Sequence, residues 1–281
     1  MTVRIITDSL SDITSEVAQK LGITIVPLTV MFGRESFLDR VTITTDEFYH
    51  RLTHDTIWPT TTQPPPSAFM GVYNKLAEVT DEILVVTLST KLSGTYQSAM
   101  NAKSLVTKKC RIEVIDSQAV AMGLGLIVIT AARAAQAGAR LDEVANLVRR
   151  TMPRSHFVVY FDTLKYLAKG GRIGKAQGLL GALLSVKPLL TVKEGEMSPL
   201  TRVRSLAAGM DYLNNFVAGF ANIEELAVEH TTTPGEADKL AERLNPHFPR
   251  ERIFRATVSP VLGVYGGPGA IALTVLEAEK K

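Results

Sequence analysis

The first half of the sequence alternates short apolar runs with segments of helical periodicity, and this alternation constrains the fold more than any other feature. Strand-like runs rich in Val, Ile and Leu occupy 3–7, 23–32, 82–89 and 111–117. Helical patterns occupy 14–21, 45–52, 68–78, 95–106, 120–137 and 141–150. Strands that alternate with helices pair in parallel, so we expect an α/β fold whose N-terminal part holds a mostly parallel, Rossmann-like sheet. Pro27 predicts that the run 23–32 divides into two strands.

The pattern changes after the segment 151–155, which we expect to be a linker because it contains Pro153 among polar residues. Five strand-like runs follow, at 156–162, 188–200, 226–231, 252–258 and 270–278. Glu194-Gly195 inside the second run predicts a hairpin turn. Helices are expected over 163–168, 176–186, 203–219 and 234–245. We therefore predict a mixed or antiparallel C-terminal sheet with helices, and two α/β domains at 1–155 and 156–281.

Composition excludes several classes of protein. Of the 281 residues, 46% are hydrophobic and 21% are charged, which is typical of a globular chain and not of a disordered one. One cysteine cannot form an intrachain disulfide, which argues against a disulfide-rich secreted scaffold and for a cytoplasmic protein. The most apolar window, 120–132, is too short for the roughly 20 residues of a spanning helix. We expect no stable membrane insertion, although transient contact with a membrane is compatible with the sequence.

The formal charge of +3 is unevenly distributed. Residues 165–204 carry eight basic and two acidic side chains, which leaves the rest of the chain slightly acidic. The same segment has one aromatic residue, Tyr166, so it lacks the stacking surface of a single-strand nucleic-acid binder. We expect no nucleic-acid partner, and we interpret the basic segment as suited to an anionic partner or a transferred phosphoryl group.

Two turns rich in hydroxyl groups follow strand-like runs. The turn 88–95 (LSTKLSGT) enters a helix through Ser93-Gly94-Thr95, where free amides and hydroxyls can hold a carboxylate or phosphate. The turn 60–66 (TTTQPPP) carries hydroxyls on a segment stiffened by prolines. On the pattern alone, a capped helix and a surface loop are the simpler interpretations. Asp8-Ser9 and Asp116-Ser117 end strands, and each aspartate is expected to cap the turn or helix after it.

Other sequence patterns do not meet the requirements of the functional sites that they resemble. The run 165–175 lacks the first glycine and the final Ser or Thr of a phosphate loop. His50 and His54 lie four apart on an expected helix with no third ligand nearby, so we interpret them as a solvated face. No G-x-S-x-G elbow is present, so a serine hydrolase of that type is not indicated.

Seven stretches, taken in order, resemble the DegV family of bacterial fatty-acid-binding proteins. They are TDSLSDI (7–13), TTQPPPSAF (61–69), LSTKLSGTYQSA (88–99), VIDSQAVAMGLG (114–125), YLAKGGRIG (166–174), KPLLTVKEGEMSPLTRVR (187–204) and VLGVYGGPGA (261–270). The resemblance implies a long-chain fatty acid such as palmitate buried between two domains, with no other cofactor and no metal. It also implies that Thr61, Thr62, Ser93 and the Gly94 amide hold the carboxylate.

The resemblance further implies a carrier and not an enzyme, which presents the acyl group to a separate fatty-acid kinase for phospholipid metabolism. The sequence departs from the family pattern at Tyr265, where a histidine is usual, and at Thr62, where serine is usual. Tyr265 can keep one hydrogen bond to the carboxylate but cannot carry a positive charge at neutral pH. The departure therefore bears more on kinase coupling than on lipid binding.

Apolar walls for the acyl chain are expected from a helical stretch, although the same spacing fits an ordinary core; the residues are Leu179, Leu180, Leu183, Leu184 and Val186. Basic residues of the C-terminal segment are expected to dock an acidic partner, namely Arg172, Arg202 and Arg204. The alternative function is an enzyme acting on a small phosphorylated metabolite, which would use these arginines and Lys175 in a compact polar cavity.

Overall fold

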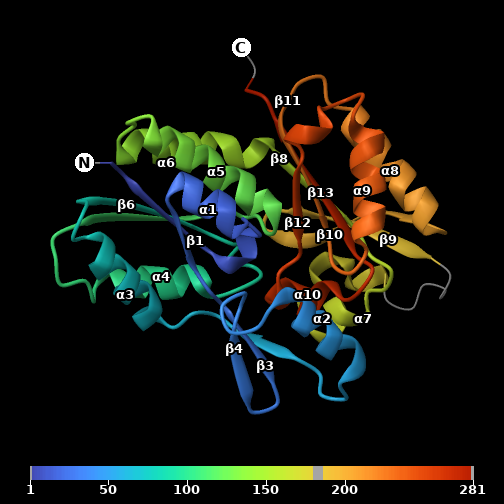
Figure 1. Ribbon diagram of the computed structural model, residues 1–281, viewed down its shortest axis with the longest axis horizontal. Coiled ribbons are helices and arrows are strands. Elements are labelled where there is room, and N and C mark those ends of the chain that lie inside the picture. The colour runs from blue at the N-terminus through green and yellow to red at the C-terminus, as the bar shows by residue number, and fades with distance from the viewer. Residues whose placement is uncertain (1, 180–185, 280–281) are drawn as a thin grey trace.

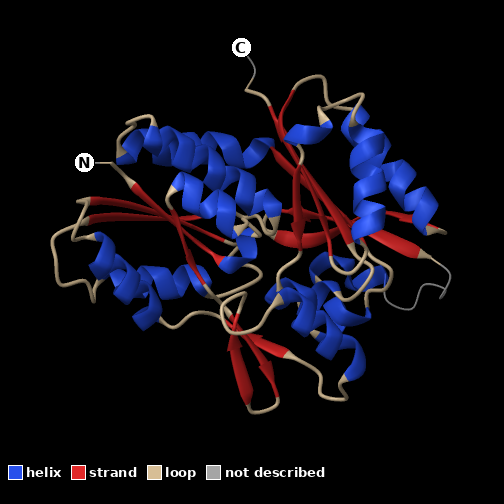
Figure 2. Ribbon diagram, in the orientation of Figure 1, coloured by secondary structure: helices blue, strands red, loops and turns tan. Residues whose placement is uncertain are grey.

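The computed structural model describes residues 2–179 and 186–279, which form two large sheets and one small one (Figures 1 and 2). The first large sheet is wholly parallel and the second is mixed. The predicted α/β class, with a parallel N-terminal sheet and a mixed C-terminal one, is therefore confirmed.

The parallel sheet has the order β2 (Ile23–Val26), β1 (Arg4–Asp8), β6 (Glu82–Thr87), β7 (Arg111–Asp116). Its central strands are buried on both faces, which explains their unbroken apolar sequence. Leu84 and Val86 of β6 pack in a different core from Ile83 and Val85, because successive side chains of a strand point to opposite faces.

Helices cover both faces of this sheet, as Figure 1 shows. One side carries α3 (Pro66–Leu76) and α4 (Thr95–Lys103). The other carries α1 (Ser15–Leu21), α5 (Met122–Gln136) and α6 (Leu141–Thr151). The helix α3 begins at Pro66, where the missing amide proton of proline is no cost because first-turn amides have no partner within the helix.

The mixed sheet has the order β10, β9, β8, β13, β11, β12, and only β11 and β12 pair in parallel. The strands are β8 (Ser155–Tyr160), β9 (Lys187–Lys193), β10 (Glu196–Val203), β11 (Ile223–His230), β12 (Phe254–Thr257) and β13 (Ile271–Glu277). The predicted hairpin joins β9 to β10 through Glu194 and Gly195, both of which have positive φ, as such turns require. The helices α8 (Leu206–Ala218) and α9 (Pro234–Leu244) cover one face.

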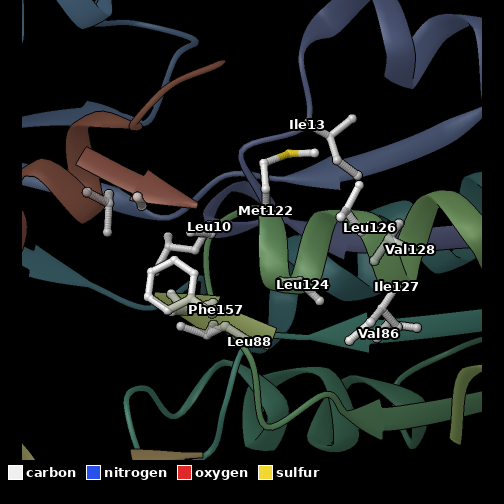
Figure 3. Close-up of a cluster of buried hydrophobic side chains, with 14 of the residues drawn as sticks. Leu10, Ile13, Val86, Leu88, Met122, Leu124, Leu126, Ile127, Val128 and Phe157 are labelled. Atoms are coloured by element: carbon white, nitrogen blue, oxygen red, sulfur yellow. The ribbon is translucent and has the colours of Figure 1, made fainter. Parts of the chain in front are cut away.

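The helix α5 packs against strands of both halves of the molecule. It is buried along nearly its whole length, and its residues share one core with β1, β6 and β8. Figure 3 shows Met122 and Leu126 of α5 beside Ile13, and Ile127 beside Val86 of β6, while Phe157 of β8 lies with Leu10 and Leu88 near the start of the helix. The apolar window 120–132 is thus a central core helix.

Some segments differ from their predictions. Thr60–Thr62, expected to be a surface loop, forms β5 and pairs with β3 (Thr29–Phe32) in a small sheet with β4 (Glu35–Leu38), beside α2 (Thr45–His54). The expected linker contains the short 3-10 helix Met152–Arg154, where Arg154 donates to the Glu277 carbonyl at 2.7 Å.

Two short helices complete the described fold. The helix α7 (Lys165–Lys169) matches its prediction, whereas α10 (Pro260–Gly266) was not predicted. The helix expected over 176–186 appears, in its described part, as a 3-10 turn at Gly174–Leu179. Leu180, Leu183 and Leu184, three of the expected wall residues, lie outside the described residues.

Candidate ligand-binding site

A cavity of about 350 Å³ lies where the two large sheets meet. Leu10 follows β1 and Leu88 follows β6, so both line the cavity from the carboxyl end of the parallel sheet. The chain continues from β1 to one side of the sheet and from β6 to the other, which makes this point the switch point of the strand order. Such points are where open α/β sheets bind ligands.

Most of the cavity wall is apolar. The parallel sheet, β8, β13 and α10 all contribute, with side chains that include Leu10, Leu88, Phe157, Val159, Val261 and Ala272. Figure 3 shows Leu10, Leu88 and Phe157 together near the start of α5. Because hydrocarbon surface buried here leaves water without losing hydrogen bonds, the wall suits an apolar chain and not a compact charged metabolite.

Hydroxyl groups interrupt the apolar wall in one region. The Thr61 and Tyr265 hydroxyls are hydrogen-bonded to each other across 204 residues of sequence. The Ser93 hydroxyl lies 2.9 Å from that of Thr95 and accepts the Thr95 amide at 3.3 Å. Thr62 lines the same cavity. The structure therefore brings Thr61, Thr62, Ser93 and Tyr265 to one cavity, as a carboxylate site would require.

Gly94 is not among the residues that line the cavity. It caps the start of α4, and its lack of a side chain leaves room for a neighbouring residue. A Cβ at this position would lie 2.2 Å from the side-chain oxygen of Gln63. Gln63 in turn donates to Ser98 at 3.1 Å, so Gly94 admits the side chain that ties the loop before α3 to α4.

Arg172, which we expected to dock a partner or, in the alternative enzyme, to line a polar cavity, lines the mainly apolar cavity. Its guanidinium lies 5.4 Å from the centre of the Tyr265 ring and donates to the carbonyls of Gly170 at 2.8 Å and Leu92 at 3.3 Å. The sequence offered no local signal for this role, because each of these partners except Gly170 comes from a distant segment. The site therefore has one cation beside its hydroxyl groups.

The remaining predicted residues lie elsewhere. Arg202 on β10 and Arg204 just after it are exposed, and neither lines the cavity. Leu179 and Val186 are partly buried but do not line it either. His50 and His54 stack on each other on an exposed face of α2, as predicted for a solvated pair.

Two buried aspartates lie behind the apolar wall. Asp8 caps the 3-10 helix Ser9–Ser11 by accepting the Leu10 amide at 3.0 Å, and it also accepts the Leu88 amide at 2.8 Å. Asp39 accepts the Ser9 hydroxyl at 2.7 Å. Burial raises the pKa of each carboxyl to about 7 despite these hydrogen bonds. They fix the backbone that presents Leu10 and Leu88 to the cavity.

Within residues 2–179 and 186–279, no cluster of three or more His, Cys, Asp or Glu side chains is arranged to hold a metal ion. Over the same part of the chain, no helix combines the length and the hydropathy needed to cross a bilayer.

Comparison with known proteins gives consistent matches over the whole length. A family model described as "Uncharacterised protein, DegV family" matches residues 2–278. A DegV domain-containing protein of Caldanaerobacter subterraneus is 37% identical over 272 residues, which cover 95% of this chain and 96% of that protein.

Solved structures are similar as well. A DegV family protein from Thermus thermophilus, described as fatty-acid-binding, superimposes with a TM-score of 0.90 at 29% identity, covering 99% of this chain and 100% of that one. A stearic acid-binding protein from Eubacterium ventriosum superimposes with a TM-score of 0.86 at 27% identity, covering 98% of each chain.

Proposed function

Because the chain belongs to the DegV family, we propose that it binds one long-chain fatty acid in the cavity between its two large sheets. The observation that carries this proposal is an apolar cavity whose hydroxyl groups gather in one region. An amphiphile with a long apolar tail and a small polar head matches that division. Residues 1–155 and 156–281 would act as two domains that enclose the tail from opposite sides.

The carboxylate would lie among Thr61, Thr62, Ser93 and Tyr265, within reach of Arg172. A sixteen-carbon acid offers about 15 apolar carbons, and their burial at about 0.8 kcal/mol each contributes about 12 kcal/mol before ordering costs. Burial of the tail then dominates affinity, so neutral hydroxyl donors are enough to orient the head group. Arg172 adds charge complementarity at the position where the acid would be ionised.

We further propose that the protein is a carrier, and that a separate fatty-acid kinase phosphorylates the bound carboxylate. The exposed Arg202 and Arg204 support the docking of a kinase, because they are cations on or next to an edge strand and neither lines the cavity. Phosphoryl transfer from a nucleotide needs cations that neutralise developing charge, and an acidic partner surface needs cations for docking. The residues of the cavity itself would bind and orient the acid.

Lipid extraction tests the first proposal. Protein purified gently from a bacterial host should release about one fatty acid per chain, measured by mass spectrometry, and the delipidated protein should bind oleic acid. A protein that carries no lipid and ignores oleic acid, yet is stabilised against heat by small phosphorylated metabolites, would favour the enzyme alternative instead.

Charge reversal tests the second proposal. Arg202→Glu with Arg204→Glu should leave oleic acid binding unchanged and should abolish phosphorylation of the bound acid by a bacterial fatty-acid kinase with ATP. The matched control is Arg255→Glu on β12, the opposite edge strand of the same sheet, which should behave as wild type in both assays. Equal phosphorylation of the double variant and the control would refute the docking role.

A further inference from the structure

Two separate segments supply most of the hydroxyl groups of the cavity. Thr61 and Thr62 belong to β5, and Gln63 follows them, whereas Ser93 lies in the turn that leads into α4. Both segments lie within the described residues, and the structure has one hydrogen bond between them, from the Gln63 amide to the Ser98 hydroxyl of α4 at 3.1 Å. The Gln63 side chain is therefore the direct tie between the two groups of hydroxyls.

Gly94 provides the space in which the Gln63 carboxamide lies. A Cβ at position 94 would be 2.2 Å from the Gln63 Oε1 atom and 2.8 Å from its Nε2 atom, so a larger residue would displace the carboxamide. Gly94 has φ of −80°, which residues with a Cβ also adopt, so the close approach of Gln63 requires glycine here and the backbone conformation does not. Pro64 restricts the backbone of Gln63 to extended conformations. The carboxamide is thus fixed from the loop and from the helix.

Gln63 also lines the cavity, together with Thr62 and Ser93. Its Nε2 atom carries two hydrogens, and Ser98 accepts one of them. Gln63 and Thr62 are exposed, so they lie where the cavity opens to solvent. A hydrogen bond to a charged acceptor is about twice as strong as one to a neutral acceptor. The second N–H of Gln63 therefore favours a carboxylate head group over an alcohol with the same tail.

We propose that Gln63 makes the site specific for an ionised carboxylate: it ties the Thr61–Thr62 segment to the segment of Ser93 and donates its second N–H to the head group. Gly94 acts through Gln63, because it leaves room for the carboxamide. This inference rests on the proposed lipid-binding function and adds a specificity-determining residue to that site. An alcohol or an ester with the same tail would lose the charge-assisted hydrogen bond and keep the apolar contacts.

Gln63→Glu tests the specificity. Glutamate has the length of glutamine and can accept the Ser98 hydroxyl, so the tie between the segments is kept while a negative charge replaces the N–H donor. Affinity for oleic acid at pH 7 should fall by at least about tenfold, because a donor to a charged head group is lost and two like charges then meet. Affinity for oleyl alcohol, which has the same tail and no charge, should not fall. Calorimetric titration of the delipidated protein measures both.

The matched control is Gln97→Glu on α4. Gln97 is exposed, lies next to Ser98 in the chain and does not line the cavity. This variant should bind both ligands as wild type does. If Gln63→Glu binds oleic acid as tightly as the control, or loses affinity for the acid and the alcohol alike, the specificity role is refuted.

A double-mutant cycle tests the role of Gly94. Gly94→Ala should displace the carboxamide, and should weaken oleic acid binding and reduce the preference for the acid over the alcohol about as much as Gln63→Ala does. In the Gln63→Ala background the clash with the carboxamide is gone, so Gly94→Ala should cost almost no further affinity. Effects that simply multiply would show that Gly94 does not act through Gln63 and would contradict the proposal.

The outcomes separate this inference from the proposed function. Wild-type protein that binds no oleic acid would overturn the proposed function, and the specificity of the site with it. Wild-type protein that binds oleic acid, with Gln63→Glu binding it equally well, would overturn this inference alone.

Discussion

At the scale of single residues, the site combines groups that local sequence identifies with groups that only the tertiary structure reveals. Ser93 and the Thr61-Thr62 pair are visible in the sequence because hydroxyls gather at strand ends. Arg172 is not, since it reaches the cavity by hydrogen bonds to Gly170 and to the distant Leu92. Gly94 shows the converse, because its motif position suggested a ligand contact whereas its close neighbour is Gln63.

Replacing Ser93 by alanine removes one hydroxyl from the polar region of the cavity without changing its apolar wall. We expect oleic acid affinity to fall about fivefold to tenfold, corresponding to about 1 kcal/mol for a lost hydrogen bond. Isothermal titration of the delipidated protein measures this. Ser67→Ala, an exposed serine of α3, is the control and should bind as wild type does.

Removing the Tyr265 hydroxyl should have a comparable effect by a different route. Tyr265→Phe breaks the bond to Thr61 but keeps the ring beside Arg172, so binding should weaken by about threefold to tenfold. Thr61→Val should produce a similar loss, and the double variant should lose less than the product of both. A double variant whose losses multiply would show that the two hydroxyls act independently.

At the scale of elements, strands and helices with a clear pattern of apolar residues in the sequence could be predicted. Elements that form only through contacts with distant segments could not. The apolar runs predicted β1, β6 and β7 within one or two residues, and for the central strands β1 and β6 burial on both faces demands that composition. β5 is three residues long and exists because it pairs with β3. α10 begins with Pro260 and contains glycine, which resembles a turn, and it is held by distant side chains.

The β9–β10 hairpin offers a test of one such long-range contact. The Ser89 hydroxyl donates to the Gly195 carbonyl at 2.6 Å, and a Cβ at 195 would lie 2.4 Å from that hydroxyl. Gly195 also has φ of +78°. Gly195→Ala should lower the free energy of unfolding by about 2 kcal/mol, of which about 1 kcal/mol is backbone strain.

Urea denaturation measures that loss, and Gly171→Ala separates its two causes. Gly171 has φ of +71° but nothing within 4 Å of an added Cβ, so its variant should show the strain alone. Equal destabilisation of the two variants would mean that the contact between the hairpin and Ser89 contributes nothing to stability.

At the scale of the whole molecule, buried carboxyl groups set how stability depends on pH. Burial raises the pKa of Asp8 and Asp39 from 3.8 to about 7, so the folded protein binds these protons more tightly than the unfolded chain. Their contribution to stability is complete below about pH 4 and is lost as the pH rises through 7. The free energy of unfolding should therefore fall from pH 5 to pH 8, on the order of 1 kcal/mol per pH unit for each carboxyl.

Denaturation by urea at several pH values checks this slope. Asp39→Asn removes one of these titrations and should make the slope shallower than in the wild-type protein. Stability that rises between pH 5 and pH 8 in the wild-type protein would show that these carboxyls are ionised in the folded state throughout.

The position of β13 has a consequence for how the protein is made. β13, the last strand of the described chain, lies in the middle of the mixed sheet, between β8 and β11, and its Ala272 lines the cavity. During synthesis, the ribosome releases the parallel sheet and α5 long before this strand appears. Until then α5 lacks part of its cover and the cavity lacks a wall. Ligand capture must therefore wait until β13 has been synthesised, and a chain that stops before this strand presents its apolar helix to chaperones and proteases.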